Sequence, residues 1–169
     1  MAKLIAKSLI YKLIKGFTEN IRFPYFPIIT RFGDHIITNG LSSIMLPFTS
    51  SLERVKTSTT YVYEPLAITS SISGTQNAPI AYRMHSNWQH RDFSNPNQHV
   101  AALLSNSENS SAIVAITNGT FLNDDIISMF GSDNLNFAIN SVEWLADNSG
   151  LIQLRNKYNT FPRIEKRSD

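Results

Sequence analysis

The order of elements along the chain predicts an α/β domain, in which helices flank a layered and mostly parallel sheet. Three observations predict this class. The first half of the chain is rich in strand-like segments and loops. The segment 111–117 is apolar at nearly every position, as in a strand buried on both faces of a parallel sheet. A short helix at 122–130 and a longer helix at 134–147 follow it. A length of 169 residues suits one domain or a large piece of one.

Residues 2–17 predict an amphipathic helix. Ile5, Leu9, Leu13 and Phe17 recur every fourth residue, and lysines border this row. The helix fits either the surface of the domain or the surface of a membrane. Basic residues gather here and in the last thirteen residues, while the middle of the chain is close to neutral. Nucleic-acid binding requires a clustered basic face, so we do not expect it.

Prolines and aromatic residues fill 18–40, where we expect an ordered loop packed by its own rings, with a binding groove as the alternative. Strands are predicted at 43–48 and 59–69, because these segments are rich in apolar and β-branched residues. Polar residues predict a loop at 70–78, and a short strand is predicted at 79–84. Trp88 and Phe93 anchor the polar stretch 85–98, and 100–104 is a short apolar run before a polar turn at 105–110.

The helix predicted at 134–147 has one apolar face. Ser132 or Asp133 is suited to its N-cap, and Gly150 stands where a helix stop is expected. Trp144 lies beside the apolar face, as a core or interface aromatic does. The residues of the apolar face are Leu135, Ala138, Ile139, Val142, Leu145 and Ala146.

Catalytic motifs are absent from the sequence. The chain has no cysteine, which excludes disulfides, thiolate nucleophiles and cysteine zinc sites. It also lacks the Gly-x-Ser-x-Gly elbow, the phosphate loop and the dinucleotide fingerprint. We therefore assign no catalytic, cofactor-binding or metal-binding residue and expect no cofactor.

Histidines and carboxylates are the remaining candidates for chemistry. His85, His90, Asp92 and His99 share a polar stretch, where they are either metal ligands or solvated loop residues, and His35 stands apart. Glu64, Asp124, Asp125 and Glu143 are the carboxylates nearest to predicted elements. The Asp124-Asp125 pair most simply favours a helix N-terminus.

Several strings in the sequence occur in the same order as in a known family. They include Phe23-Pro24-Tyr25-Phe26-Pro27, His35-Ile36-Ile37-Thr38-Asn39, Ser43 to Leu52, Glu64 to Ser71 and Val100 to Leu104. The closest string runs from Asn136 to Ala146, with Gly150-Leu151-Ile152 after it. From residue 22 to 158 the chain resembles auxiliary components of bacterial ABC transporters, of which the gliding-motility-associated GldG proteins of Bacteroidetes are the best known.

The resemblance implies an extracytoplasmic (periplasmic) domain with a glutamine-amidotransferase-like, flavodoxin-like fold, of which this chain holds the C-terminal part. It implies a position beside an ABC permease and its ATPase, with membrane anchors outside this chain, since no apolar run here reaches the length of a membrane span. Where the family has Gly-Asp-x-x-Phe, this chain has Thr117-Asn118-Gly119-Thr120-Phe121, without the Asp. A partial sheet would expose an edge, so a homo-oligomer is left open.

We divide the chain into an N-terminal helix of unclear role at 1–21, the α/β domain at 22–154, and a polar tail or linker at 155–169. The leading functional hypothesis is a non-catalytic binding or scaffolding domain of a transport complex. The alternatives are a stand-alone interaction protein of the cell envelope and a hydrolase that uses Ser or a His-bound metal.

Overall fold

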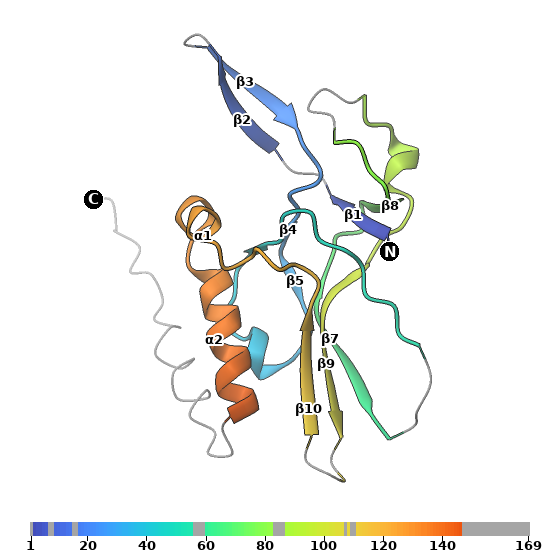
Figure 1. Ribbon diagram of the computed structural model, residues 1–169, viewed down its shortest axis with the longest axis vertical. Helices are drawn as coiled ribbons and strands as arrows, with labels where there is room; N and C mark the ends of the chain where they lie inside the picture. The colour runs from blue at the N-terminus through green and yellow to red at the C-terminus, as the bar shows by residue number, and fades with distance from the viewer. Residues whose placement is uncertain are drawn as a thin grey trace, which may run out of the picture.

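The computed structural model describes residues 2–6, 9–14, 17–55, 60–82, 87–106, 108 and 111–146 (Figure 1). Short strands dominate the first two thirds of the chain, and the α-helices follow in the last third. The strands are β1 (Ala2–Ala6), β2 (Leu9–Ile14), β3 (Phe17–Arg22), β4 (Ile28–Ile29), β5 (Arg31–Phe32), β6 (Ile44–Met45), β7 (Val62–Ile68), β8 (Ser73–Asn77), β9 (His99–Asn106) and β10 (Ser111–Ile116). The helices are the 3-10 turns η1 (Ile36–Thr38) and η2 (His90–Phe93), then α1 (Asp124–Phe130) and α2 (Asp133–Ala146).

The main sheet has four strands in the order β10-β9-β7-β5, and every neighbouring pair is antiparallel. The predicted mostly parallel, flavodoxin-like sheet is therefore wrong. The physical reason lies in the connections: only residues 107–110 join β9 to β10, whereas a parallel crossover needs a dozen residues or more. The other strand pairs, β1-β8, β2-β3 and β4-β6, are antiparallel too.

The prediction that segment 111–117 is buried on both faces is also wrong. A strand forms there as expected, but β10 lies at the end of the sheet, and the Ile113 side chain is 58% exposed. The central strand is β9, where Val100, Ala101, Ala102 and Leu103 are fully buried. Apolar composition alone does not separate a central strand from an edge strand, because both present the same residue types.

The N-terminal segment differs from the prediction as well. In place of a helix over 2–17, the chain forms β1, the hairpin of β2 and β3, and an antiparallel pair between β1 and β8. Residues four apart lie on one face of a strand as well as on one face of a helix, so the apolar row that predicts a helix fits strands too. Because β8 occupies 73–77, the loop predicted at 70–78 is partly wrong, and the described part of 79–84 is not a strand.

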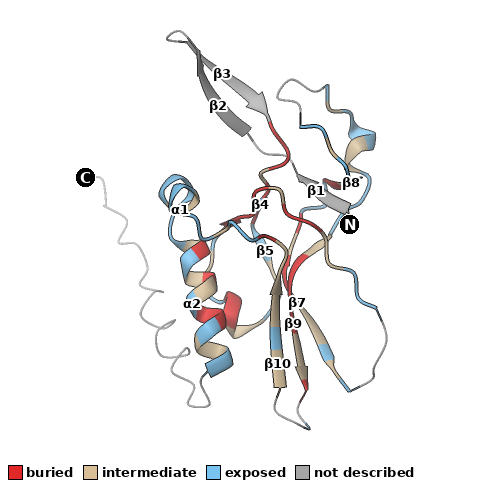
Figure 2. Cartoon of the chain, viewed as in Figure 1, coloured by how far each residue is buried: buried red, intermediate tan, exposed pale blue. Residues whose placement is uncertain are grey.

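Both α-helices lie on one side of the main sheet, and the described segment that ends at Val55 lies on the other (Figure 1). Phe137 of α2 is fully buried against Leu66 of β7 and Leu103 of β9. Figure 2 shows buried positions along the inner side of α2 and exposed positions on its outer side. The apolar face predicted for this helix is the outer one: Leu135, Ile139, Val142 and Leu145 are all exposed.

Polar side chains flank Phe137 on the inner side of α2, because they bond to backbone groups of β6 and η1 that face the helix. Asn134 accepts from Met45 N–H at 2.8 Å and donates to Met45 C=O at 2.8 Å and Phe121 C=O at 2.7 Å. Asp133 accepts from Ser42 N–H at 2.8 Å, and Asn140 donates to Ile37 C=O at 2.8 Å. These bonds tie β6 and η1 to the helix, so the buried amides meet their hydrogen-bonding requirement.

A second cluster of side chains is aromatic. Phe23 and Tyr25 are buried and contact Phe48 and Trp88, with Phe26, Tyr82 and Phe93 around them. Phe23–Pro27 is thus packed by its own rings, as the sequence predicts, and Trp88 and Phe93 anchor the polar stretch 85–98. The loop predicted at 18–40 is otherwise partly wrong, because β3, β4, β5 and η1 occupy much of that range. The predicted tail at 155–169, Gly150 and His85 lie outside the described residues.

No helix among the described residues has the length and apolar content that crossing a membrane requires.

Candidate functional site

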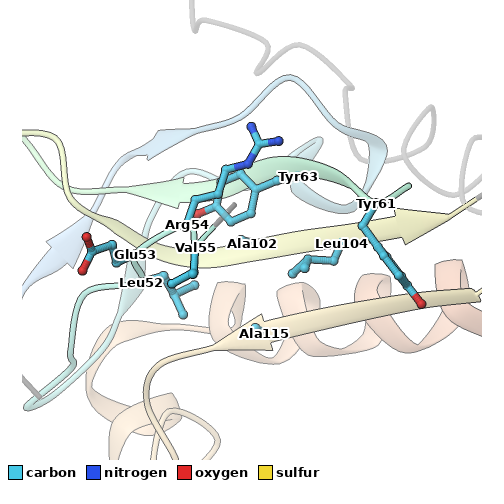
Figure 3. A pocket seen from close by; sticks show the side chains of 9 residues that line it. All are labelled: Leu52, Glu53, Arg54, Val55, Tyr61, Tyr63, Ala102, Leu104 and Ala115. Atoms are coloured by element: carbon cyan, nitrogen blue, oxygen red, sulfur yellow. The ribbon is translucent and has the colours of Figure 1, made fainter. Parts of the chain in front are cut away.

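A groove lies on the open face of the main sheet, on the side away from the α-helices (Figure 3). Its floor is formed by small and aliphatic residues of the two neighbouring strands: Ala102 and Leu104 of β9, and Ala115 of β10. The segment Leu52 to Val55 and the rings of Tyr61 and Tyr63 form its walls. The groove has a volume of about 190 Å³, which suits one side chain or a fragment, since pockets for drug-sized ligands begin near ~300 Å³.

One wall of this groove is a chain of interacting side chains. The Arg54 guanidinium lies over the Tyr63 ring, 5.7 Å from its centroid, a cation–π contact that Figure 3 shows from the open face. The Tyr63 hydroxyl lies 2.8 Å from Nδ1 of His99, and the two rings stack at 5.6 Å. Leu52 N–H donates to the His99 carbonyl at 2.7 Å, which fixes the wall to the sheet.

Burial controls the charge of this wall. It raises the pKa of the Tyr63 phenol, an effect that the neighbouring Arg54 charge opposes. Burial also lowers the pKa of His99, so neutral imidazole is favoured. The Tyr63 hydroxyl and His99 Nδ1 share a hydrogen bond whose donor depends on the imidazole tautomer. The charged side chains of the wall are Arg54 and Glu53, so the groove combines an apolar floor with a polar, charged wall.

The metal ligands considered from the sequence lie in different settings. His99 is in β9 and bonded to Tyr63, while His90 and Asp92 belong to η2, where Asp92 accepts from Gln89 N–H at 2.8 Å. Within the described ranges no group of three or more His, Cys, Asp or Glu side chains could hold a metal. His35 forms the N-cap of η1 by accepting from Ile37 N–H at 3.2 Å, and its ring lies 5.2 Å from that of Trp144.

The carboxylates considered from the sequence are also dispersed. Asp124 and Asp125 are exposed in the first turn of α1, where they favour the helix N-terminus as predicted. Glu64 is on β7 and raises the pKa of His35, against the larger lowering by burial. Glu143 is on α2, and Trp144 packs against the main core as expected.

A second surface, the outer helix face, is formed by exposed apolar side chains of α1 and α2. Val142 is 65% exposed and Met129 is 69% exposed, and the helices carry no Lys or Arg. A helix normally buries its apolar side, so this distribution is the reverse of the usual one. The residues of the outer helix face are Met129, Phe130, Leu135, Ile139, Val142 and Leu145.

The sequence indicates the α2 residues of the outer helix face as an apolar row, but it indicates neither Met129 and Phe130 of α1 nor the groove. Tyr61 and Tyr63 are predicted only as parts of a strand, and His99 only as a metal-ligand candidate or solvated residue of a polar stretch. The signal available was the period of two in β7, which places Tyr61 and Tyr63 on one face. Arg54 carried no signal, because it lies outside any regular element.

Comparison with known families gives one match. A family model described as an ABC-type uncharacterized transport system, auxiliary component, matches residues 13–158. No curated protein and no solved structure matches the chain.

Proposed function

Because the chain belongs to the family of auxiliary components of ABC-type transport systems, we propose that it is a non-catalytic scaffold that binds other components of its transporter. The observation that carries the proposal is the outer helix face. Exposed apolar side chains gathered on two neighbouring helices commonly mark a site of protein association. Family membership supports the class of partner: the permease and the ATPase of the same transporter.

The charges around the outer helix face support a partner with matching chemistry. The α-helices contain no basic residue, and besides the inward-bonded Asp133 their acidic residues are Asp124, Asp125 and Glu143. An apolar patch with an acidic border fits an apolar surface bordered by Lys or Arg, since complementary charge favours the correct partner and speeds association. We therefore expect the partner subunit to offer an apolar groove with basic residues at its rim.

The proposal includes a location. We propose that the domain lies on the extracytoplasmic (periplasmic) side of the inner membrane, beside the permease. Segments outside this chain hold it there. We also propose that its transporter serves gliding motility. The likeness of Asn136 to Ala146 to the GldG proteins supports this part. Because the chain has no cysteine, a single Asp125→Cys variant reports the side of the membrane by its labelling in intact cells with a membrane-impermeant maleimide.

Co-purification tests the scaffold directly. The chain is co-expressed with the ABC permease and ATPase proposed as its partners, and the affinity-tagged permease is recovered from detergent. We expect the wild-type chain to be recovered with it and Val142→Glu to be lost, because a charge replaces a 65% exposed apolar contact.

The matched control is Val55→Glu, since Val55 is 73% exposed but lies on the groove side of the sheet. It should be recovered like the wild type. Equal recovery of Val142→Glu and wild type would refute the outer helix face as the docking surface. No recovery of the wild type itself would favour a stand-alone interaction protein instead.

A further inference from the structure

The outer edge of β10 lacks the protection that edge strands normally have. Proteins usually guard such edges with Lys, Pro, bulges or very short strands, because an open edge pairs with other chains. β10 reads Ser-Ala-Ile-Val-Ala-Ile, without charge or proline, and it pairs with β9 in unbroken register from Ser111 to Ile116. Among the described strands, β9 is its one partner.

Alternation along β10 shows which of its backbone groups face outward. Thr117 N–H donates to Val100 C=O at 3.0 Å, so this residue pair is hydrogen-bonded across the β9-β10 ladder. Bonded and non-bonded pairs alternate in an antiparallel ladder. Ser111, Ile113 and Ala115 therefore bond to β9. The residues between them, Ala112, Val114 and Ile116, direct N–H and C=O away from the sheet.

We propose that a second copy of this chain adds to this edge, with β10 paired antiparallel to itself about a two-fold axis at Val114. A two-fold axis perpendicular to the sheet leaves every side chain on the same face of the sheet. Residues that lie opposite each other across the axis must therefore share a face. This requires the axis to pass at a residue position and not midway between two residues. With the axis at Val114, the outward groups of Ala112, Val114 and Ile116 on both strands bond to one another. With the axis at Ile113 instead, the outward N–H and C=O groups of Ile116 would have no partner in β10 of the second copy.

Side chains on the open face suit this register. Ile113 is 58% exposed, and the register sets it opposite Ala115 of the second copy, a large residue against a small one. Since Ala115 is part of the groove floor, Ile113 of the second copy extends the groove wall. The strand carries no charge, so no like charges meet across the axis. These features favour a copy of the same strand as the occupant.

The flank of α2 gives a second, independent observation. Asn140 bonds to Ile37 of η1, which contacts β7, so this side of α2 points toward the β7 end of the sheet. At 100° per residue, Ala138 and Leu145 lie on the opposite flank, toward β10. Leu145 is 46% exposed. Sheet extension through β10 would bring the two copies of this apolar flank toward each other.

Disulfide cross-linking tests the register, since the chain contains no cysteine. Ile113→Cys protein and Ala115→Cys protein are oxidised separately and as a mixture. We expect dimers in the mixture, because residues directly opposite in a ladder come within disulfide range. Each variant alone should stay uncross-linked, since its own copies lie about 8 Å apart, beyond that range. Cross-linking of Ile113→Cys alone would overturn the Val114 axis.

Sedimentation velocity from about 1 to 200 µM tests the dimer itself. We expect the wild-type chain to dimerise in this range and Val114→Pro to weaken the dimer at least about tenfold. The proline removes an N–H that faces away from β9, so the β9-β10 hydrogen bonds are kept, but it also removes the packing of Val114 on the core. Ile113→Lys should act alike, with Val62→Lys as the control of equal 58% exposure. A wild-type chain that stays monomeric throughout, or a dimer that both edge variants leave intact, would overturn the proposal.

Discussion

The two faces of α2 differ in a way opposite to most surface helices. The inner face buries Asn134, Asn140 and Ser141 beside Phe137, while the outer face exposes leucine, isoleucine and valine. The difference follows from what each face meets. The inner face meets backbone of β6 and η1 that needs hydrogen-bond partners, and amides supply them. The outer face meets no described element of the chain, and we attribute its apolar residues to a partner.

The largest expected effect distinguishes an apolar residue on each face. Phe137→Ala should lower the free energy of unfolding by about 3–5 kcal/mol, because it leaves a cavity at the centre of the core. Ile139→Ala, at a residue 37% exposed on the outer face, should cost less than about 1 kcal/mol. Urea denaturation of both variants measures the contrast. Equal losses would show that the outer face is packed as well as the inner one.

A smaller effect is expected from the inner amide that binds η1. Asn140→Ala should cost about 1–3 kcal/mol, since it leaves the buried Ile37 carbonyl without its donor at 2.8 Å. Asn136→Ala is the control, because among the described residues its side chain bonds only to Asp133 Oδ1, at 3.4 Å. Thermal unfolding of the two variants compares them. A loss for Asn136→Ala that matches that for Asn140→Ala would contradict the special role of the inner face.

The smallest effect is a pH dependence beside the inner face. Burial lowers the pKa of His35 below its usual 6.5, and Glu64 opposes this in part. The unfolded chain therefore binds a proton more readily, so the contribution of His35 is fully present above pH 6.5 and is lost as the pH falls below it. Protonation also removes the Nδ1 acceptor of Ile37 N–H.

The variant His35→Gln should flatten the decline in stability between pH 7.5 and 5, measured by urea denaturation at each pH. The half-buried His99 also has a lowered pKa, so a residual slope should remain. An unchanged slope in His35→Gln would show that His35 is equally easy to protonate in both states.

The sequence predicts elements here better than it predicts their arrangement. β7, β10, α1 and α2 form where propensity and periodicity indicate them, because those signals are local. The direction of the apolar face of α2 is not local, since it depends on the backbone of β6 and η1, far away in sequence. The antiparallel pairing of β9 and β10 was predictable in principle, because residues 107–110 are too few for a crossover.

The candidate site shows the same difference between local signals and long-range contacts. The α2 residues of the outer helix face are evident in the sequence as an apolar row, while the groove requires Arg54, Tyr63 and His99 to meet from three separate segments. The incorrect helix prediction at the N-terminus shows the opposite case, in which a local signal is present but misleading. Residues 2–17 satisfy a helical period, and β1 then pairs with β8, whose Ser-Gly-Thr-Gln-Asn sequence gives no strand signal.

Replacing a buried polar residue of α2 with an apolar one, and the adjacent exposed apolar residue with a polar one, tests most directly whether the polar face of this helix is the one that packs inward. Asn134→Leu should destabilise the fold by about 3 kcal/mol or more, because the backbone of Met45 and Phe121 loses three bonds to the amide. Leu135→Asn should change the free energy of unfolding by only about 0.5 kcal/mol, since Leu135 is 41% exposed. Urea denaturation of the two variants measures both changes in the free energy of unfolding. A stabilised Asn134→Leu variant, or a Leu135→Asn variant that loses more than about 2 kcal/mol, would contradict the account.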